Sequence, residues 1–323
     1  MRWVMLLATV LGTSSFQATS PLILVSNEAS SDITMIDART NKVVRRIVVG
    51  DRPRGIHVSP DKRTLYVAIS DAQANVQSGR DAIVAIDLRT KRILYRIESG
   101  TDPEEFGLSP DGRFLYASNE DAGTASIVDL RTRKVLATLV VGIEPEGVAV
   151  SPDGRWVYVT AETSNTVSVI DTRKRDVVQS FLVNVRPRGV AFSPDGKRAY
   201  ITCEISGTLD IVDVARHEVI GSVTLEDGKG KPVGVAVSPD SRRVFVANGG
   251  TGAVVVVDAT SQKIVARTPV GRRPWGLALS RDGSSVYTAN GVTNDVSVID
   301  TRTNRVIATI KAGDKPWGVT VVQ

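Results

Sequence analysis

Apolar and polar residues alternate along this chain in short runs that are separated by turn residues. The stretch that starts at residue 145, PEGVAVSPDGRWVYVTAETSNTVSVIDTRKRDVVQSFLV, contains four such runs: GVAVS, VYVT, VSVID and VVQSF. Each run has the length of a β-strand, and alternation with a period of two is the pattern of strands rather than helices. The segments SPDG, ETSN and DTRKRD between the runs have the composition of tight turns. The stretch therefore predicts four antiparallel strands joined by short loops.

An aspartate that closes an apolar run recurs at nearly constant spacing along the chain. Successive positions differ by 42 residues in four of the six intervals, and the aspartates are Asp37, Asp87, Asp129, Asp171, Asp213, Asp258 and Asp300. Seven copies of such a unit indicate a repeat architecture, and four strands per unit are typical of a propeller blade. The prediction is an all-β fold, a seven-bladed β-propeller of four-stranded antiparallel blades.

The two ends of the repeat region predict how the ring closes. The repeats begin inside a unit, at the run LILVSN over residues 22–27, and they end on the first run of another unit, PWGVTVVQ over 316–323. The last strand can therefore pair with the first three, which hides both exposed sheet edges. Six blades are then continuous, and the seventh is shared between the two ends.

The first twenty residues differ from the repeats. Arg2 precedes the apolar run WVMLLATVL over 3–11, which is too short to span a bilayer, and the polar stretch GTSSFQATS follows. This pattern predicts a signal peptide over 1–20 and a propeller domain over 21–323, so we expect a periplasmic or secreted protein. An uncleaved anchor is the alternative. No later run has the length of a membrane helix.

Composition narrows the candidate chemistry. The 323 residues carry 40 Lys and Arg against 35 Asp and Glu, and the net charge of +5 could attract anions without indicating nucleic acid by itself. Two histidines and one cysteine give no His/Cys metal cluster and no haem attachment motif, so the sequence assigns no cofactor. Cys203 is expected to be a small buried residue, and His217 is expected to lie in a solvated turn.

The repeat serves as its own control, because a position that one blade treats differently stands out. In the first run of each unit, one position is glycine in six blades and Glu105 in the second blade. Two residues later the other blades have Ala, Thr or Gly107, and the first blade has His57. Both positions are expected on one face of the innermost strand, where space is short. His57 and Glu105 are therefore candidates for a hydrogen-bonding or acid–base pair at the channel, unless they only fill space left by Gly107.

The loops that lead into the first run carry charged and aromatic residues around a proline. Blades two and three are acidic there, and the other blades are mostly basic or aromatic. Trp275 and Trp317 beside cations predict a stacking surface, with packing between blades as the alternative. The candidate ligand-binding residues are Arg52, Arg54, His57, Glu105, Glu146, Arg188, Arg273, Trp275, Lys315 and Trp317.

The loops between the second and third runs are expected on the same face of the ring. They carry a set of carboxylates that could hold a cation such as calcium or form salt bridges to the rim arginines: Glu28, Asp71, Glu120, Glu162 and Glu204. Gly249 and Gly291 in these loops are expected to open the approach to the tryptophans. The insertion AQANVQSGR over 72–80 predicts a polar flap at the mouth, with disorder as the alternative.

The second run of each unit carries a family resemblance. LYVAIS, LYASNE, VYVTAE, AYITCE, VFVANG and VYTANG resemble the signature strand of the YVTN β-propeller repeat, and the resemblance covers everything after residue 21. Among exported members with seven repeats, the chain resembles the propeller proteins associated with PQQ-dependent catabolism of alcohols. This narrower resemblance implies a partner such as a periplasmic dehydrogenase or transport component.

These observations define three classes of function. The main prediction is a non-enzymatic periplasmic binding or scaffold propeller, which holds a small anionic ligand or a partner protein and which the resemblance links to PQQ-dependent alcohol catabolism. The first alternative is an enzyme that hydrolyses lactones at the propeller mouth with His57, Glu105 and Arg54. The second is single-stranded nucleic-acid binding through Trp275, Trp317 and the basic rim, which the acidic blades disfavour.

Overall fold

A computed structural model describes residues 20–71, 79–226 and 229–323 of the chain. The predicted signal peptide over 1–20 lies outside the described residues except for Ser20, and so does most of the insertion over 72–80. Every element in the described ranges is a β-strand. The described residues contain no helix that is long and apolar enough to cross a membrane.

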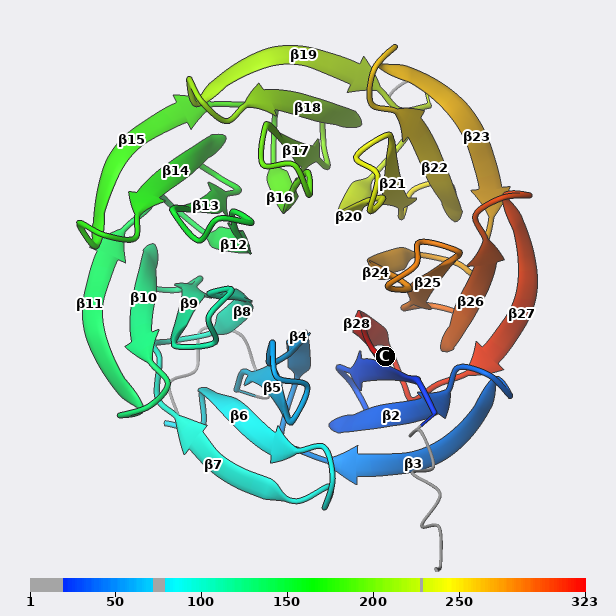
Figure 1. The fold of residues 1–323 in the computed structure, drawn as a ribbon, viewed down its shortest axis with the longest axis horizontal. Helices are drawn as coiled ribbons and strands as arrows, with labels where there is room; N and C mark the ends of the chain where they lie inside the picture. The colour runs from blue at the N-terminus through cyan, green and yellow to red at the C-terminus, as the bar shows by residue number, and fades with distance from the viewer. Residues whose placement is uncertain (1–19, 72–78, 227–228) are drawn as a thin grey trace, which may run out of the picture.

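Seven antiparallel sheets of four strands each form a ring, like the blades of a propeller seen along its axis (Figure 1). This confirms the predicted fold class. The innermost strand of every blade begins at a proline, and these strands are β4 (Pro53–Val58), β8 (Pro103–Leu108), β12 (Pro145–Val150), β16 (Pro187–Phe192), β20 (Pro232–Val237), β24 (Pro274–Leu279) and β28 (Pro316–Val322). The second strands are β1 (Leu22–Asn27), β5 (Thr64–Ile69), β9 (Phe114–Asn119), β13 (Trp156–Ala161), β17 (Arg198–Cys203), β21 (Arg243–Asn248) and β25 (Ser285–Asn290).

The third strand of every blade ends at one of the seven aspartates that define the repeat. These strands are β2 (Asp32–Asp37), β6 (Ala82–Asp87), β10 (Thr124–Asp129), β14 (Thr166–Asp171), β18 (Thr208–Asp213), β22 (Ala253–Asp258) and β26 (Asp295–Asp300). The outer strands are β3 (Lys42–Val48), β7 (Ile93–Ile97), β11 (Lys134–Val140), β15 (Asp176–Leu182), β19 (Glu218–Thr224), β23 (Lys263–Pro269) and β27 (Arg305–Lys311). The repeat aspartate starts a turn: Asp37 Oδ1 accepts the backbone N–H groups of Arg39 and Thr40, both at 2.9 Å.

The ring closes through the shared blade that the chain ends predict. Strand β28 pairs with β1 in antiparallel register, from Leu22 opposite Val322 to Val25 opposite Val319. The sheet order β28-β1-β2-β3 therefore joins the last strand to the first three. In Figure 1 the red β28 lies beside the blue β1 at the end of the chain. The closure prediction is confirmed.

The hydrophobic core is divided among the interfaces between neighbouring blades. Each of seven clusters of buried side chains combines residues from two adjacent blades. In one of them, Leu24 and Met35 of the shared blade pack with Leu65 and Val84 of the next. Full burial of such a side chain contributes about 1.5–3 kcal/mol, so the stability of the ring depends on every blade having both neighbours.

Hydroxyl groups on the second strands connect neighbouring blades near the axis. The Thr160 hydroxyl accepts the Gly147 N–H at 2.8 Å and donates to the Arg188 carbonyl of the next blade at 2.7 Å. The Ser26 hydroxyl accepts the Gly318 N–H at 2.9 Å and donates to the Arg54 carbonyl at 2.6 Å. One hydroxyl thus satisfies a backbone donor and a backbone acceptor that belong to different blades.

The inner strands approach one another so closely that a side chain rarely fits between them. A Cβ atom at Gly234 would lie 2.5 Å from the Trp275 carbonyl oxygen, and one at Gly318 would lie 2.7 Å from the Arg54 carbonyl oxygen. Glycine is therefore required here because of the close approach of the next strand, not because of its backbone angles.

Of the predictions for Cys203 and His217, the first is confirmed and the second is wrong. Cys203 is fully buried, as predicted, and burial raises the pKa of its thiol. The prediction that His217 is solvated is wrong, because this side chain is only 8% exposed. The Tyr158 hydroxyl lies 2.6 Å from its Nδ1, and Trp156 packs against the ring edge-on. Burial lowers the pKa of His217.

Deletion of residues 316–323 should destabilise the propeller strongly, because it removes the inner strand of the shared blade and exposes an edge of β1. We expect the melting temperature to fall by about 10 °C or more, as measured by circular dichroism. Removal of Gln323 alone, which follows β28, is the control and should change little. A truncated protein that melts like the full chain would contradict the closure.

Candidate functional site

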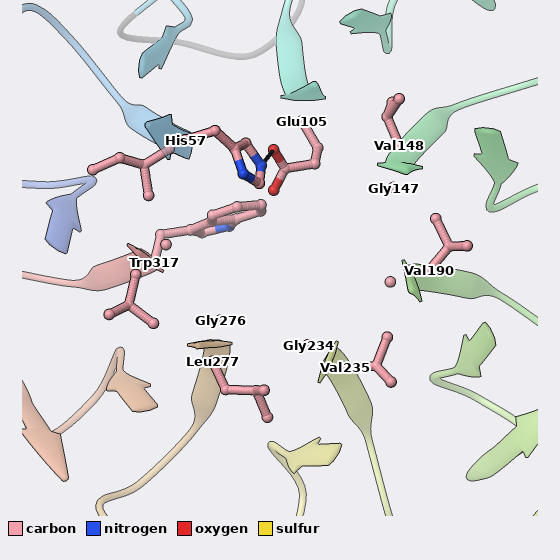
Figure 2. Close-up of a pocket in the computed structure, with 14 residues that line it drawn as sticks. His57, Glu105, Gly147, Val148, Val190, Gly234, Val235, Gly276, Leu277 and Trp317 are labelled. Carbon is pink, nitrogen blue, oxygen red and sulfur yellow. Dashed lines mark hydrogen bonds and ion pairs between the residues drawn. The ribbon is translucent and has the colours of Figure 1, made fainter. Parts of the chain in front are cut away.

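Two cavities lie on the ring axis. All seven inner strands contribute residues to the wall of the larger one. That cavity has a volume of about 150 Å³, and its wall consists mainly of glycine and aliphatic positions. Three larger side chains enter it, those of His57, Glu105 and Trp317 (Figure 2). The second cavity has a volume of about 80 Å³ and shares Glu105 and Trp317 with the first. The second residues of three inner strands also line it: Glu146, Arg188 and Trp275.

His57 and Glu105 form a hydrogen-bonded pair between adjacent blades. Nε2 of His57 lies 2.8 Å from Oε1 of Glu105, and Figure 2 shows both side chains reaching toward the cavity. Oε1 also accepts the Phe106 N–H at 2.8 Å, which fixes the carboxylate. The Phe106 ring packs edge-on against the imidazole at 5.0 Å. The His57 side chain remains 42% exposed and that of Glu105 21% exposed.

The local packing explains why the first two blades can hold this pair. A Cβ atom at Gly55 would lie 2.6 Å from Oε1 of Glu105, so the glycine makes room for the carboxylate. Gly107 has a different neighbour, since a Cβ there would lie 2.8 Å from the Val150 side chain of the third blade. The space at Gly107 is therefore used by Val150. The interpretation that His57 and Glu105 merely fill this space loses its basis.

The pair favours a protonated imidazole. Burial disfavours the charged form of His57, but the negative charge of Glu105 and its hydrogen bond outweigh burial and raise the pKa of His57 above 6.5. The hydrogen bond engages Nε2, and no described residue forms a hydrogen bond with Nδ1. In the neutral histidine, Nε2 can thus donate to Glu105 while Nδ1 is left as a proton acceptor.

The rim arginines of the first blade are tied to carboxylates. Arg54 lies 3.2 Å from Glu28 and also pairs directly with Glu104. Arg52 lies 3.5 Å from Asp102 and 3.7 Å from Glu28. The carboxylates of Asp102, Glu104 and Glu120 come within 4.8 Å of one another, and the two guanidinium groups neutralise this cluster. Of the two uses weighed for the loop carboxylates, salt bridges are the one observed.

A second ion-pair network lies around Trp275. Arg188 contacts Glu146 at 2.7 Å and also pairs with Glu162, and its side chain is only 10% exposed. Arg273 lies 2.9 Å from Glu204 and 4.2 Å from the centre of the Trp275 ring. Trp275 is thus packed within charged side chains as part of the network. The further pairs of this network join Arg186 to Glu162 and Glu204, and Arg188 to Glu204 at 3.8 Å.

Two glutamates of the rim hold their protons unusually tightly. Burial, together with the charges of Glu146 and Asp102, raises the pKa of Glu120 to about 7. Burial also raises the pKa of Glu146 well above its usual value, although the Arg188 charge opposes this effect. Glu120 therefore loses its negative charge as the pH falls through about 7.

The structure brings together six of the ten predicted ligand-binding residues. His57, Glu105, Glu146, Arg188, Trp275 and Trp317 line the two cavities. Arg52, Arg54, Arg273 and Lys315 line neither of them. The first three form ion pairs, and Lys315 lies on an exposed loop. Arg54, expected to act with His57 and Glu105, is instead occupied by Glu28 and Glu104.

Two further observations change the expectations for this face. A Cβ atom at Gly291 would lie 2.6 Å from the Trp275 ring, so this glycine makes room for the tryptophan and does not open a path to it. A Cβ atom at Gly249 would likewise meet Arg273 at 3.2 Å.

Phe106, which supports His57, was missed by sequence analysis. The sequence does single out Phe106, because it is the only aromatic residue at an inner-strand position where the other blades have Ile, Val or Leu.

Two family models match parts of the chain. One is described as a lactonase with a seven-bladed β-propeller and matches residues 178–311. The other is described as the cytochrome D1 heme domain and matches residues 69–190. Each match covers less than half of the chain. A haem is considerably larger than the central cavity of about 150 Å³, so the residues that line this cavity do not fit that group. No curated protein matches the sequence.

Solved structures share the fold over nearly their whole length. The periplasmic gluconolactonase PpgL of Pseudomonas aeruginosa is 22% identical with a TM-score of 0.77, and the match covers 94% of this chain and 99% of that one. A candidate 6-phosphogluconolactonase of Bacteroides uniformis is 18% identical with a TM-score of 0.78, at the same coverages. Hydrazine synthase of Kuenenia stuttgartiensis is 23% identical with a TM-score of 0.78, covering 91% and 99%. At these identities the likeness shows the fold.

The comparisons correct the main functional prediction. A non-enzymatic binding or scaffold propeller accessory to PQQ-dependent alcohol catabolism is contradicted, because one of the two matched family models and two of the similar structures are described as lactonases. They favour the first alternative, an enzyme of the lactonase type. The fold predicted from the YVTN resemblance is confirmed as a seven-bladed propeller, while the matched models are of other propeller families.

Replacement of Glu120 by Gln should stabilise the protein in a pH-dependent way. The folded-state pKa of about 7 lies above the usual value near 4.5, so ionisation of Glu120 destabilises the fold increasingly between these two pH values and constantly above pH 7. We expect Glu120→Gln to raise the free energy of unfolding by about 1–2 kcal/mol at pH 8 and to leave it unchanged at pH 4.5. Urea titrations at both pH values test this. Glu144→Gln, at an exposed rim position, is the control.

Proposed function

We propose that this protein is a lactone hydrolase whose reaction takes place in the central cavity. The observation that carries the proposal is the hydrogen-bonded pair of His57 and Glu105, which is set into a wall of glycine and aliphatic residues. A titratable pair at one end of an otherwise apolar cavity is the arrangement expected of an acid–base site. The lactonase model and the lactonases among similar structures support this class of reaction.

The geometry suggests a role for each member of the pair. Glu105 accepts a hydrogen bond from the Nε2–H group of His57 and thereby fixes the ring and its tautomer. The Nδ1 atom then removes a proton from a water molecule. The water oxygen forms a bond to the lactone carbonyl carbon, and the ring C–O bond breaks. His57 then returns the proton to the departing alkoxide oxygen, and the product is the open-chain hydroxy acid.

Trp317 has the position of a substrate-orienting residue. It lines both cavities, and Figure 2 shows its indole ring beside His57 and Glu105. An aromatic face of this kind packs well against the carbon–hydrogen face of a small ring. Trp275 is held by Arg273 and lines only the second cavity, so we assign it to the support of the rim.

The periplasm is the proposed location of this activity. The predicted signal peptide over 1–20 and the likeness to a periplasmic gluconolactonase support it. The finer resemblance to the YVTN repeat stays a prediction, and the proposed reaction does not depend on it.

Replacement of His57 by Ala should reduce kcat/KM for glucono-δ-lactone by about 100-fold or more, because the proton acceptor is lost. A pH indicator assay, corrected for the uncatalysed reaction, measures this rate. The control is His217→Ala, which removes the other histidine far from the cavity and should leave the activity per folded molecule unchanged. Full activity of His57→Ala would contradict the assignment of the base.

The activity should rise with pH, because only the neutral imidazole can accept a proton. We expect a midpoint above 6.5, since the pKa of His57 is raised by Glu105. Glu105→Gln keeps a hydrogen-bond acceptor but removes the charge, so it should move the midpoint to lower pH. A pH profile of kcat/KM for both proteins tests this, and an unshifted midpoint would show that His57 is not the titrating group.

A further inference from the structure

We infer that the central site takes neutral lactones and discriminates against lactones that carry a phosphate group. This inference rests on the proposed function and names the substrate class of the same site. The similar structures include one protein described as a gluconolactonase and another described as a candidate 6-phosphogluconolactonase. The charges around the two cavities distinguish between the two kinds of lactone.

The guanidinium groups of the two ion-pair networks are already neutralised. Five arginines face seven carboxylates in the two ion-pair networks, and each of these arginines has at least one carboxylate within 4.0 Å. Recognition of a phosphate dianion ordinarily uses arginine or lysine groups that are available for bidentate or direct contact. An arginine paired in this way would have to give up a buried carboxylate partner, which would leave that carboxylate uncompensated.

The walls of the cavities offer no other cation to a phosphate. His57 and Arg188 are the only basic side chains that line the described cavities on the axis, and both are paired with glutamates. The Glu105 carboxylate lines the same space, and like charges brought together there are unfavourable. Lys231, Arg272 and Lys315 lie on exposed parts of the loops and line neither cavity.

Backbone N–H groups bind phosphates in many proteins, and three of those in the cavity wall are also engaged. The N–H groups of Gly147, Gly189 and Gly318 donate to the hydroxyls of Thr160, Thr202 and Ser26 within 2.9 Å. These glycines belong to the cavity wall, so their donors are directed into the blade interface. A neutral ring loses nothing from the lack of free cations, and it can pack against the apolar wall and Trp317.

A comparison of two substrates of one ring type tests the inference. We would measure kcat/KM at pH 7.5 for glucono-δ-lactone and for 6-phosphoglucono-δ-lactone, with His57→Ala protein as the background. The expected ratio favours the neutral lactone by at least about tenfold. Inorganic phosphate at millimolar concentration should not inhibit hydrolysis of the neutral lactone.

A charge-changing variant separates electrostatics from size. Glu162→Gln removes a carboxylate shared by Arg186 and Arg188, so it should raise the relative kcat/KM for the phosphorylated lactone by about threefold or more. Glu144→Gln makes the same change at an exposed position outside both networks and should leave the ratio unchanged. Hydrolysis of the neutral lactone by each variant shows that the ring has folded.

The outcomes distinguish the inference from the function on which it rests. Preference for the neutral lactone, together with a shift caused only by Glu162→Gln, supports the inference. Equal or better hydrolysis of the phosphorylated lactone, or competitive inhibition by phosphate, overturns the inference and leaves the hydrolase proposal standing. Hydrolysis of neither lactone by correctly folded protein overturns the proposed function and the inference with it.

Discussion

The close approach of seven inner strands to one axis is the constraint on which the rest of this structure depends. A Cβ atom at most of the glycine positions would collide with the carbonyl oxygen of the next strand, as it would at Gly234 and Gly276. The second-strand hydroxyls then fasten one blade to the next across this narrow gap, as Thr160 and Thr202 do. The second blade departs from the rule at Glu105, and the only polar pair of the larger cavity is found there. The candidate site is thus a local exception to the packing that builds the ring.

The charged rim has a structural role that its composition alone does not reveal. Arginines on this face could be expected to bind an anionic ligand, but buried guanidinium groups require partners, and the loop carboxylates supply them. Arg188 is almost fully buried between Glu146 and Glu162, and Arg273 reaches Glu204 from a loop 69 residues further along the chain. The networks connect loops of different blades, so they hold the mouth in one shape.

Much of the fold and part of the site could be predicted from the sequence, for physical reasons that differ. The alternation of apolar and polar residues predicts the strands, and the recurring aspartate predicts the seven repeats. The incomplete repeats at 22–27 and 316–323 predict that these two segments pair with each other. His57 and Glu105 could be found because six other blades show what packing alone requires at their positions. The partners of Arg54 and Arg273 could not be predicted from the sequence, because ion pairs between blades depend on how far each side chain reaches and leave no periodic pattern. His217 was misjudged for a similar reason, since its polar turn folds onto Tyr158 and Trp156.

The strand that closes the ring also carries Trp317 into the cavity, and this has a consequence for biosynthesis. The chain is made from its N-terminus, so His57 and Glu105 are synthesised before β28, which follows all the other strands of the ring. Until β28 is available, β1 lacks its inner partner and the cavity lacks one of its walls. A nascent chain can therefore form individual blades but not the complete site. Any activity of this cavity begins only when β28 has been synthesised and has paired with β1.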